Sequence, residues 1–128
     1  MRPPFSRLYP ILDASLETLE TLPASVRALG RAGCRLFQLR AKGLPDDELY
    51  RWAVMAAEVS REVGMKFLVN DRADVALLAD ADGVHLGQDD LSPESAREIL
   101  GGKAIIGLST HGVDEARRAA QAPVDYLA

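Results

Sequence analysis

Short apolar runs alternate along this chain with longer segments in which apolar residues recur every three or four positions. The short runs are typical of buried β-strands, and the longer segments are typical of amphipathic helices. The predicted strands cover residues 8–12, 36–40, 66–70, 83–86, 104–108 and 124–127. The predicted helices cover residues 16–29, 45–63, 73–79, 93–100 and 113–121, the first of them interrupted near Pro23. The pattern therefore predicts five βα units followed by a sixth strand.

Residues that favour helix ends support these boundaries. Ser92 is of a type favoured as an N-cap, and Pro93 suits the first position of the helix that follows. Gly33 and Gly64 each follow a predicted helix, where glycine commonly ends the helical conformation. Strict alternation of strands and helices favours parallel strands joined by helical crossovers.

The alternation alone leaves two parallel architectures open, a doubly wound open sheet and a (β/α)8 barrel. Polar residues follow the second, third, fourth and fifth predicted strands alike. This favours a barrel mouth, because an open sheet gathers functional groups at one switch point. We therefore expect an α/β fold, a (β/α)8 TIM barrel, of which the chain covers about the first five βα units and strand six.

A complete barrel usually needs about 250 residues, and this chain has 128. We expect residues 1–128 to form a single, incomplete TIM-barrel domain. On this view the chain is the N-terminal part of a longer protein, or its remaining strands come from another chain.

Composition narrows the functional class only by exclusion. With 48% hydrophobic and 27% charged residues, the chain has the composition of a globular protein. Its net charge of −4 gives no support for a nucleic-acid partner, and no apolar run approaches the about 20 residues of a membrane span. Pro3 and Pro4 stand where a signal peptide would carry its apolar region, so the cytoplasm is the default location. Cys34 stands alone and is expected to be a buried structural residue.

Two cationic residues mark the end of the second predicted strand. Arg40 and Lys42 lie two positions apart, so their side chains point to the same side, and Gln38 joins them. Two neighbouring cations repel each other unless an anion lies between them, and a diphosphate is a suitable anion. The alternative for this segment is a pair of solvated cations at the entrance of a loop.

Acidic residues follow the next two predicted strands. Asp71 comes directly after Asn70, and Asp89 and Asp90 share one turn. Adjacent acids repel each other, and a cation offsets that cost. Mg²⁺ typically binds one or two carboxylates together with phosphate oxygens and water, a requirement that Asp71 and Asp90 match. The alternatives are a helix N-cap at Asp71 and a polar turn ahead of Ser92.

Ser109 and the two histidines complete the set of candidate residues. Ser109 follows the fifth predicted strand, within reach of a phosphate or a substrate ring. His85 lies inside a predicted strand, where a hydrogen-bonded, barrel-lining role is favoured over a catalytic base. For His111, proton transfer and a capping role before the next helix both stay open. The order of Ser, His and Asp indicates no nucleophile, so no acid or base is assigned.

Taken together, four segments closely resemble the thiamin phosphate synthase family. They read Gln-Leu-Arg-Ala-Lys at 38–42, Asn-Asp-Arg-Ala-Asp at 70–74, Gly-Val-His-Leu-Gly-Gln-Asp-Asp-Leu at 83–91 and Gly-Leu-Ser-Thr-His at 107–111. The resemblance runs from about Leu8 to the last residue, but it reaches only the first part of a family member. It implies a (β/α)8 barrel and a Mg²⁺-dependent transferase of thiamin biosynthesis. That enzyme joins hydroxymethylpyrimidine diphosphate to hydroxyethylthiazole phosphate, giving thiamin phosphate and pyrophosphate.

The resemblance also assigns roles to residues. By matching positions it implies that the pyrimidine diphosphate contacts Gln38, Arg40, Lys42, Asn70 and Ser109. Asp71 and Asp90 would hold Mg²⁺. It implies a dissociative reaction, in which pyrophosphate leaves a resonance-stabilised pyrimidine cation that the thiazole nitrogen captures. Such a reaction requires charge neutralisation on the leaving group rather than a strong base.

The chain departs from the family pattern in two ways, of which the first bears on activity. The family's Thr- and Lys-bearing loop after strand six has no counterpart, and neither do the Gly-rich phosphate loops after strands seven and eight. Ala41 also stands where the family usually has an acid. We therefore leave open whether this chain is truncated and inactive alone, and whether it forms a homo-oligomer.

Two other functions remain as alternatives. A thiazole tautomerase-like relative would share the barrel but commonly lacks the paired metal carboxylates, so Asp71 and Asp90 argue against it, whereas His111 keeps it open. A non-catalytic half-barrel binding module, which pairs with another chain, would agree with the early end of the barrel pattern.

Overall fold

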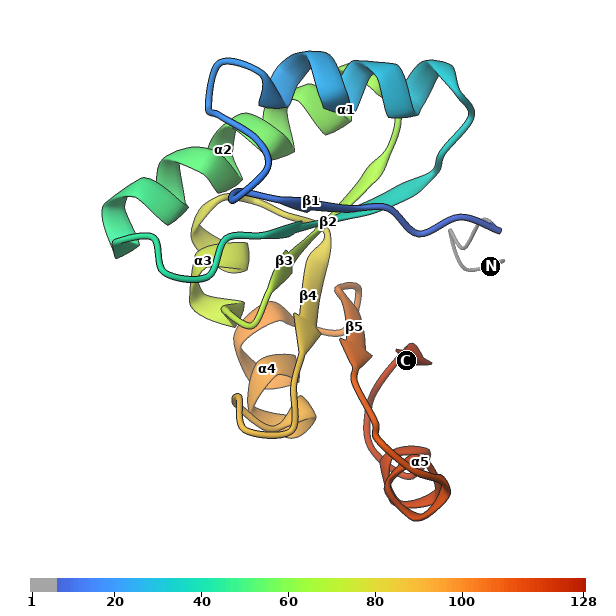
Figure 1. Ribbon diagram of the computed structural model, residues 1–128. Coiled ribbons are helices and arrows are strands. Elements are labelled where there is room, and N and C mark those ends of the chain that lie inside the picture. The colour runs from blue at the N-terminus through green and yellow to red at the C-terminus, as the bar shows by residue number, and fades with distance from the viewer. Residues whose placement is uncertain (1–6) are drawn as a thin grey trace.

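The computed structural model describes residues 7–128, in which six parallel strands form one sheet (Figure 1). The strands are β1 (Ile11–Asp13), β2 (Leu36–Arg40), β3 (Lys66–Asn70), β4 (Gly83–Leu86), β5 (Ile105–Leu108) and β6 (Tyr126–Leu127). They lie side by side in chain order, and each pairs in parallel with the next. A doubly wound sheet would reverse its strand order at a switch point. The uninterrupted order confirms the barrel-type arrangement of the predicted α/β fold.

Among residues 7–128, the helices lie on one face of this sheet. They are α1 (Leu22–Arg31), α2 (Asp46–Val63), α3 (Ala73–Leu78), α4 (Pro93–Leu100) and α5 (Val113–Ala119). Figure 1 shows α1 and α2 above β1 and β2, with α3 and α4 beside the strands that follow. Each crossover thus returns on the same side of the sheet, as in the outer helical ring of a barrel.

The hydrophobic core lies between the sheet and these helices. Alternate strand residues contribute to it, and the rings of Phe37 and Phe67 stack with their centroids 5.1 Å apart. Close packing of α1 on α2 needs a glycine, because a Cβ at Gly30 would lie 2.8 Å from the Cβ of Val63. Cys34 is buried, as predicted.

The first predicted helix begins too early. The structure turns at residues 14–21 instead, and α1 starts at Leu22. Leu16, expected on the buried face of a helix, is 87% exposed. The turn forms because Asp13 accepts a hydrogen bond from the N–H of Ser15, while its carbonyl accepts one from Leu16. Pro23, expected to interrupt the helix, lies in its first turn, where proline is favoured.

Both terminal strands are shorter than predicted. The first covers residues 11–13 rather than 8–12, and the last covers 126–127 rather than 124–127. Pro10 has no N–H to donate, so it contributes only its carbonyl, which accepts from Gln38 at 2.9 Å. Residues 1–6 lie outside the described part of the chain, and with them Pro3 and Pro4, on which the expectation about a signal peptide rests.

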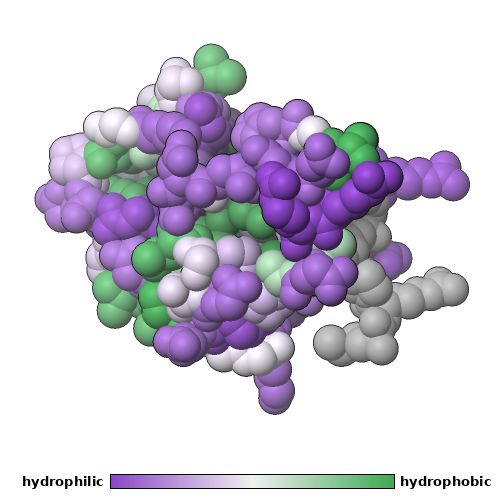
Figure 2. All heavy atoms as spheres, turned by 90° about the horizontal axis from the view of Figure 1, so that it is seen from below, coloured by the Kyte–Doolittle hydropathy of each residue, from purple (hydrophilic) through white to green (hydrophobic). Residues whose placement is uncertain are grey.

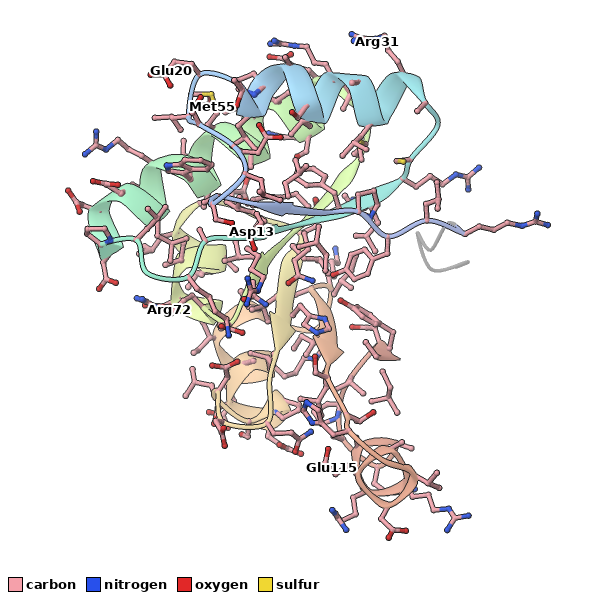
Figure 3. The ribbon with its side chains drawn as sticks, in the orientation of Figure 1. Asp13, Glu20, Arg31, Met55, Arg72 and Glu115 are labelled. Carbon is pink, nitrogen blue, oxygen red and sulfur yellow. The ribbon has the colours of Figure 1, made fainter. Side chains whose placement is uncertain are left out.

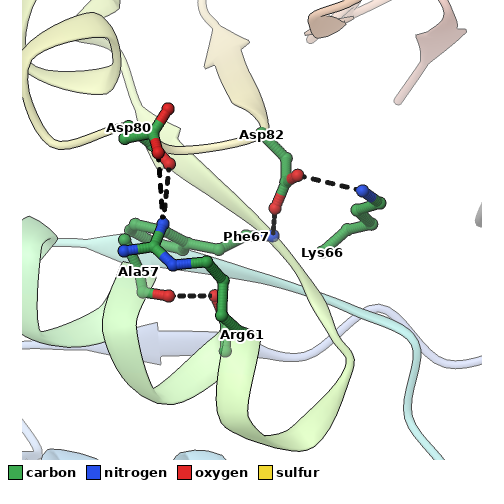
Figure 4. Close-up of polar contacts among 7 residues, drawn as sticks. Ala57, Arg61, Lys66, Phe67, Asp80 and Asp82 are labelled. Carbon is green, nitrogen blue, oxygen red and sulfur yellow. Dashed lines mark hydrogen bonds and ion pairs between the residues drawn. The ribbon is translucent and has the colours of Figure 1, made fainter.

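Aspartates tie together the end of the sheet at which the strands begin. Asp82, directly before β4, accepts a hydrogen bond from the N–H of Phe67 at 2.9 Å and pairs with Lys66 at 3.1 Å (Figure 4). Asp125, directly before β6, accepts from the N–H of Ile106 at 2.8 Å. In barrels this end serves stability, whereas the opposite end carries the active site.

Within residues 7–128, none of the helices combines the length and the apolar character that crossing a membrane requires.

Candidate active site

A pocket of about 520 Å³ opens where the strands end. It is lined by all seven residues that the sequence predicts for the site: Gln38, Arg40, Lys42, Asn70, Asp71, Asp90 and Ser109. These residues come from β2 and β3 and from the segments that follow β2, β3, β4 and β5. The structure therefore brings the predicted residues together, while their individual binding roles stay predictions.

Each of the two cations in the pocket has a carboxylate beside it. A guanidinium nitrogen of Arg40 lies 2.7 Å from Asp13, and Lys42 Nζ lies 3.5 Å from Asp71. Asp13 also accepts hydrogen bonds from the N–H and the hydroxyl of Ser15. These bonds, with the contribution of Arg40, lower the pKa of Asp13 to about 2. Asp13, which lies near the end of β1 in Figure 3, thus holds a fixed negative charge beside Arg40.

Asp71 occupies a costly position. Its backbone has a φ of 69°, in the left-handed region that non-glycine residues rarely adopt. Partial burial and the neighbouring Asp90 carboxylate raise the pKa of Asp71, and Lys42 offsets this only in part. The alternative that Asp71 caps the next helix is wrong, because the N-cap position of α3 is Arg72 and no side chain caps it.

Asp90 completes a pair of facing carboxylates. One of its oxygens accepts a hydrogen bond from the N–H of Gly87 at 2.7 Å, which fixes the turn after β4. The turn then leads to Ser92, whose hydroxyl caps α4 by accepting from the N–H of Ser95. Asp90 therefore lies in a polar turn before a cap, and it also faces Asp71 across the pocket.

The acid pair fits a hard divalent cation. Among residues 7–128, no group of three or more His, Cys, Asp and Glu side chains is placed to hold a metal ion. Two carboxylates at an open pocket are nevertheless the donor set that Mg²⁺ takes when phosphate oxygens and water supply its other ligands. A metal held by Asp71 and Asp90 would therefore bind together with an anionic substrate.

Arg72 belongs to the surface beside this site. Its guanidinium pairs with Asp74 and with Asp46, each at 2.8 Å. These two carboxylates raise the pKa of Arg72, so its charge is permanent and already matched. In Figure 3 this side chain lies beside α3, on the helical side of the molecule.

A continuous chain of hydrogen bonds crosses the floor of the pocket. Asn70 bonds to Gln38 at 2.8 Å, and Gln38 bonds to the hydroxyl of Tyr9 at 3.0 Å. The hydroxyls of Tyr9 and Tyr126 lie 2.6 Å apart, although the residues are 117 positions apart in the sequence. This contact joins the segment before β1 to β6, across the open face of the sheet.

His85 continues the chain to the fifth strand. Its Nδ1 lies 2.7 Å from the Tyr126 hydroxyl, and its Nε2 lies 2.7 Å from Ser109 Oγ. The side chain is buried, and burial lowers the pKa of His85 below its ordinary value. His85 therefore has the hydrogen-bonded, barrel-lining placement that the sequence favours.

His111 has a different environment. Its ring is 72% exposed and lies 3.3 Å from Glu115, which also accepts a hydrogen bond from the N–H of His111 at 2.8 Å. These hydrogen bonds from His111 lower the pKa of Glu115. Figure 3 shows Glu115 at α5, so the contact ties the segment before this helix to its first turn, whereas the N-cap position itself is Gly112 and no side chain caps it.

Sequence reasoning missed the two tyrosines of the floor. The signal for Tyr126 is Gly107, a glycine inside a strand, which often marks a close approach of another group. A Cβ at Gly107 would lie 2.0 Å from Cζ of Tyr126, so only glycine leaves room for this ring. Tyr9 gives no comparable signal, because its partners are distant in the sequence.

The rim of the pocket is polar. The side-chain amide of Gln88 donates to the carbonyl of Ser109 at 2.7 Å, which joins the segments after β4 and β5. Figure 2, which views the molecule from below Figure 1, shows mostly hydrophilic residues with smaller hydrophobic areas between them. Arg40 and Lys42, three acids (Asp71, Asp89 and Asp90) and several neutral donors in one pocket suit a polyanion bridged by a metal ion.

Comparison with known proteins points to one family. The family described as thiamine monophosphate synthase matches residues 8–128. A thiamine-phosphate synthase of Pelotomaculum thermopropionicum is 50% identical over 96 residues, which are 75% of this chain and 44% of that protein. One of Persephonella marina is 42% identical over 120 residues, which are 94% of this chain and 57% of that protein. The structure of thiamine phosphate pyrophosphorylase from Pyrococcus furiosus is similar with a TM-score of 0.80 and 37% identity, covering 93% of this chain and 57% of that one. The chain spans about half the length of the curated relatives it matches.

Proposed function

Because the chain belongs to the thiamine monophosphate synthase family, we propose that it provides the part of a thiamin phosphate synthase that binds hydroxymethylpyrimidine diphosphate with Mg²⁺. The reaction joins the pyrimidine to hydroxyethylthiazole phosphate and releases pyrophosphate. The net charge of −4 favours small-molecule ligands over nucleic acid, and a cytoplasmic location is part of the same proposal.

One observation carries this proposal. Arg40, Lys42, Asp71 and Asp90 follow three different strands, yet all four line one pocket. The carboxylate of Asp90 lies close enough to raise the pKa of Asp71, and such an acid pair is costly unless a cation binds to it. A diphosphate with a divalent cation supplies both signs at once, because its oxygens meet the two cations while the metal meets the two acids.

The residues divide the work of binding and charge neutralisation. Arg40 and Lys42 hold the diphosphate oxygens, and the amides of Gln38 and Asn70 orient the pyrimidine ring from the pocket floor. Bound Mg²⁺ supplies further neutralisation of the leaving pyrophosphate. Loss of pyrophosphate from an electron-rich ring needs no general base, which agrees with the neutral His85.

The same pocket argues against a tautomerase-like function. That alternative rests on His111 as a proton carrier; His111 lines the pocket, but its ring is largely exposed and held to Glu115 at the start of α5. The paired carboxylates Asp71 and Asp90 would have no role in a metal-free isomerisation.

Binding is the direct test, because the chain spans about half of its relatives. Calorimetric titration with pyrophosphate should show binding that depends on Mg²⁺. Arg40→Ala should weaken it about tenfold or more, because a charge-assisted hydrogen bond is lost. Asp90→Asn retains an acceptor for the N–H of Gly87 and should remove the Mg²⁺ dependence. Asp47→Asn, at an exposed position of α2, is the matched control and should bind as the wild type does.

Two results would contradict the proposal. One is equal binding with and without Mg²⁺, and the other is wild-type affinity in both pocket variants. Turnover of the pyrimidine diphosphate, measured beside thiazole isomerisation, would then separate the synthase from the tautomerase-like alternative.

A further inference from the structure

Five side chains that line the pocket are joined through a sixth, Tyr126, by five consecutive hydrogen bonds. In order along the chain of contacts they are Asn70, Gln38, Tyr9, Tyr126, His85 and Ser109. Their donors and acceptors are not independent, because each tyrosine hydroxyl carries one proton and a neutral imidazole carries one N–H. A single direction that runs through all five bonds supplies each of them with one donor proton.

The two amides set that direction. Asn70 Nδ2 donates to Gln38 Oε1 at 2.8 Å, and Gln38 Nε2 then donates to the Tyr9 hydroxyl at 3.0 Å. Since the Tyr9 oxygen accepts from Gln38, its own proton is left for the Tyr126 oxygen, 2.6 Å away. A bond that runs from Tyr9 to Tyr126 continues the direction that the two amides set.

The direction continues through the imidazole. In this direction the Tyr126 hydroxyl accepts from Tyr9 and donates its proton to His85 Nδ1, which lies 2.7 Å away. A ring nitrogen that accepts carries no proton, which places the ring proton on Nε2. Nε2–H then donates to Ser109 Oγ at 2.7 Å, and the hydroxyl proton of Ser109 takes no part in these five hydrogen bonds.

We propose that these contacts form a one-way relay of hydrogen-bond donors, which holds His85 as the neutral Nε2–H tautomer and directs the Ser109 hydroxyl proton toward an anionic oxygen in the pocket. Tyr9, Tyr126 and His85 act through Ser109 and are positioning residues. The identity of the anion rests on the proposed function, whereas the tautomer does not.

The electrostatics of the floor agree with this arrangement. Burial raises the pKa of Tyr9 and of Tyr126, so both hydroxyls keep their protons. Burial also lowers the pKa of His85, which keeps the ring neutral. A relay of the opposite direction would turn the lone pairs of Ser109 toward the pocket, where they would repel a phosphate.

The tautomer can be read directly from the intact protein. The chain has only two histidines, so ¹⁵N-resolved spectra of the imidazole rings contain two sets of signals, and His111→Ala identifies the set of His85. We expect a protonated Nε2 and an unprotonated Nδ1 at neutral pH. A protonated Nδ1, which the opposite orientation of the Gln38 amide would produce, or a doubly protonated ring would overturn the relay.

A tyrosine variant tests whether the relay sets the tautomer. Tyr126→Phe removes the donor to Nδ1, so both tautomers of His85 should appear in the spectrum. Binding of magnesium pyrophosphate should weaken about threefold to tenfold, as expected for one misdirected hydrogen bond. Tyr50→Phe on α2, outside the pocket, is the matched control and should change neither the spectrum nor the affinity.

The outcomes separate the relay from the proposed function. An unchanged tautomer in a folded Tyr126→Phe protein would overturn the relay, even if pyrophosphate binding were lost. The relay would be supported if the wild type has the Nε2–H tautomer of His85 and Tyr126→Phe shows both tautomers. If the wild type then failed to bind magnesium pyrophosphate, that failure would count against the proposed function alone.

Discussion

The close approach of Tyr126 to Gly107 makes Gly107→Ala the sharpest structural test of the pocket floor. The added Cβ would lie 2.0 Å from Cζ and 2.3 Å from the hydroxyl oxygen of Tyr126. Carbon atoms in ordinary contact lie about 3.5–4.0 Å apart, so the ring must move by more than an ångström. That movement breaks the hydrogen bonds of its hydroxyl with Tyr9 and His85.

The expected cost follows from these losses. Overpacking of a filled site costs about 1–3 kcal/mol, and each lost hydrogen bond costs about 0.5–1.5 kcal/mol. Because movement of the ring relieves part of the overlap, the two contributions do not add in full. We therefore expect Gly107→Ala to lower the free energy of unfolding by about 2–4 kcal/mol.

Urea unfolding followed by circular dichroism measures this cost. Gly102→Ala is the matched control, because a Cβ there meets no atom within 4 Å. A second background, Tyr126→Ala, removes the ring with which the new methyl group collides. In that background Gly107→Ala should cost at least about 1.5 kcal/mol less, which a double-mutant cycle resolves. An equal cost in both backgrounds would refute the reasoning.

Three further predictions concern acidic residues. Asp71→Asn should stabilise the Mg²⁺-free protein at pH 7, because a raised pKa means that ionisation of Asp71 opposes folding. The stability that the protonated carboxyl contributes is full below pH 3.8 and is lost as the pH rises through the folded-state pKa. Thermal unfolding should therefore show no gain over the wild type below pH 3.8. Asp13→Ala should destabilise the protein at pH 7, because a pKa lowered to about 2 means that the ionised carboxylate stabilises the fold. That stability is present above pH 3.8 and is lost as the pH falls through about 2. The same unfolding experiment from pH 7 to pH 2 should show the difference from wild type disappearing. Asp82→Ala leaves the N–H of Phe67 without its acceptor and should lower the free energy of unfolding in urea by about 1–3 kcal/mol. Its calorimetric affinity for magnesium pyrophosphate should stay unchanged, since Asp82 lies at the opposite end of the sheet.

The sequence identifies the charged residues of the site because parallel strands repeat one geometry. Every strand delivers its last residues to the same end of the sheet, so position relative to the strand is enough to group Arg40, Asp71, Asp90 and Ser109. This inference needs only the order of strands and helices. It does not need side-chain packing, which is why it succeeds before any coordinates are known.

The same reasoning does not reach the pocket floor. Tyr9 and Tyr126 meet across the open face of the sheet, and their contact depends on its curvature and on the missing side chain at Gly107. The curvature cannot be read from sequence spacing, and Gly107 signals a close approach without identifying the ring that makes it. The pairing of Asp13 with Arg40 is likewise set by the register of β1 against β2, which places these two residues opposite each other.

The error at the first helix has a local cause. Leu16 falls on the helical period of residues 16–29, but Asp13 binds the backbone of the residues that follow it and turns the chain. Such side-chain to backbone bonds compete directly with helical ones. The apolar period was therefore a weaker determinant than one aspartate at the end of a strand.

The two ends of the sheet use aspartate in opposite ways, and this contrast locates function better than any single contact. Asp82 and Asp125 satisfy backbone N–H groups of neighbouring strands, so each stabilises the fold directly. Asp71 combines a left-handed backbone with partial burial beside Asp90, and Lys42 at 3.5 Å offsets only part of that cost. Strain and like charges persist at a site when they serve binding or catalysis rather than folding. Removing the carboxylate of Asp71 should therefore remove metal-dependent binding without loss of stability, whereas removing that of Asp82 should do the reverse, and a fold that needed both equally would contradict this division.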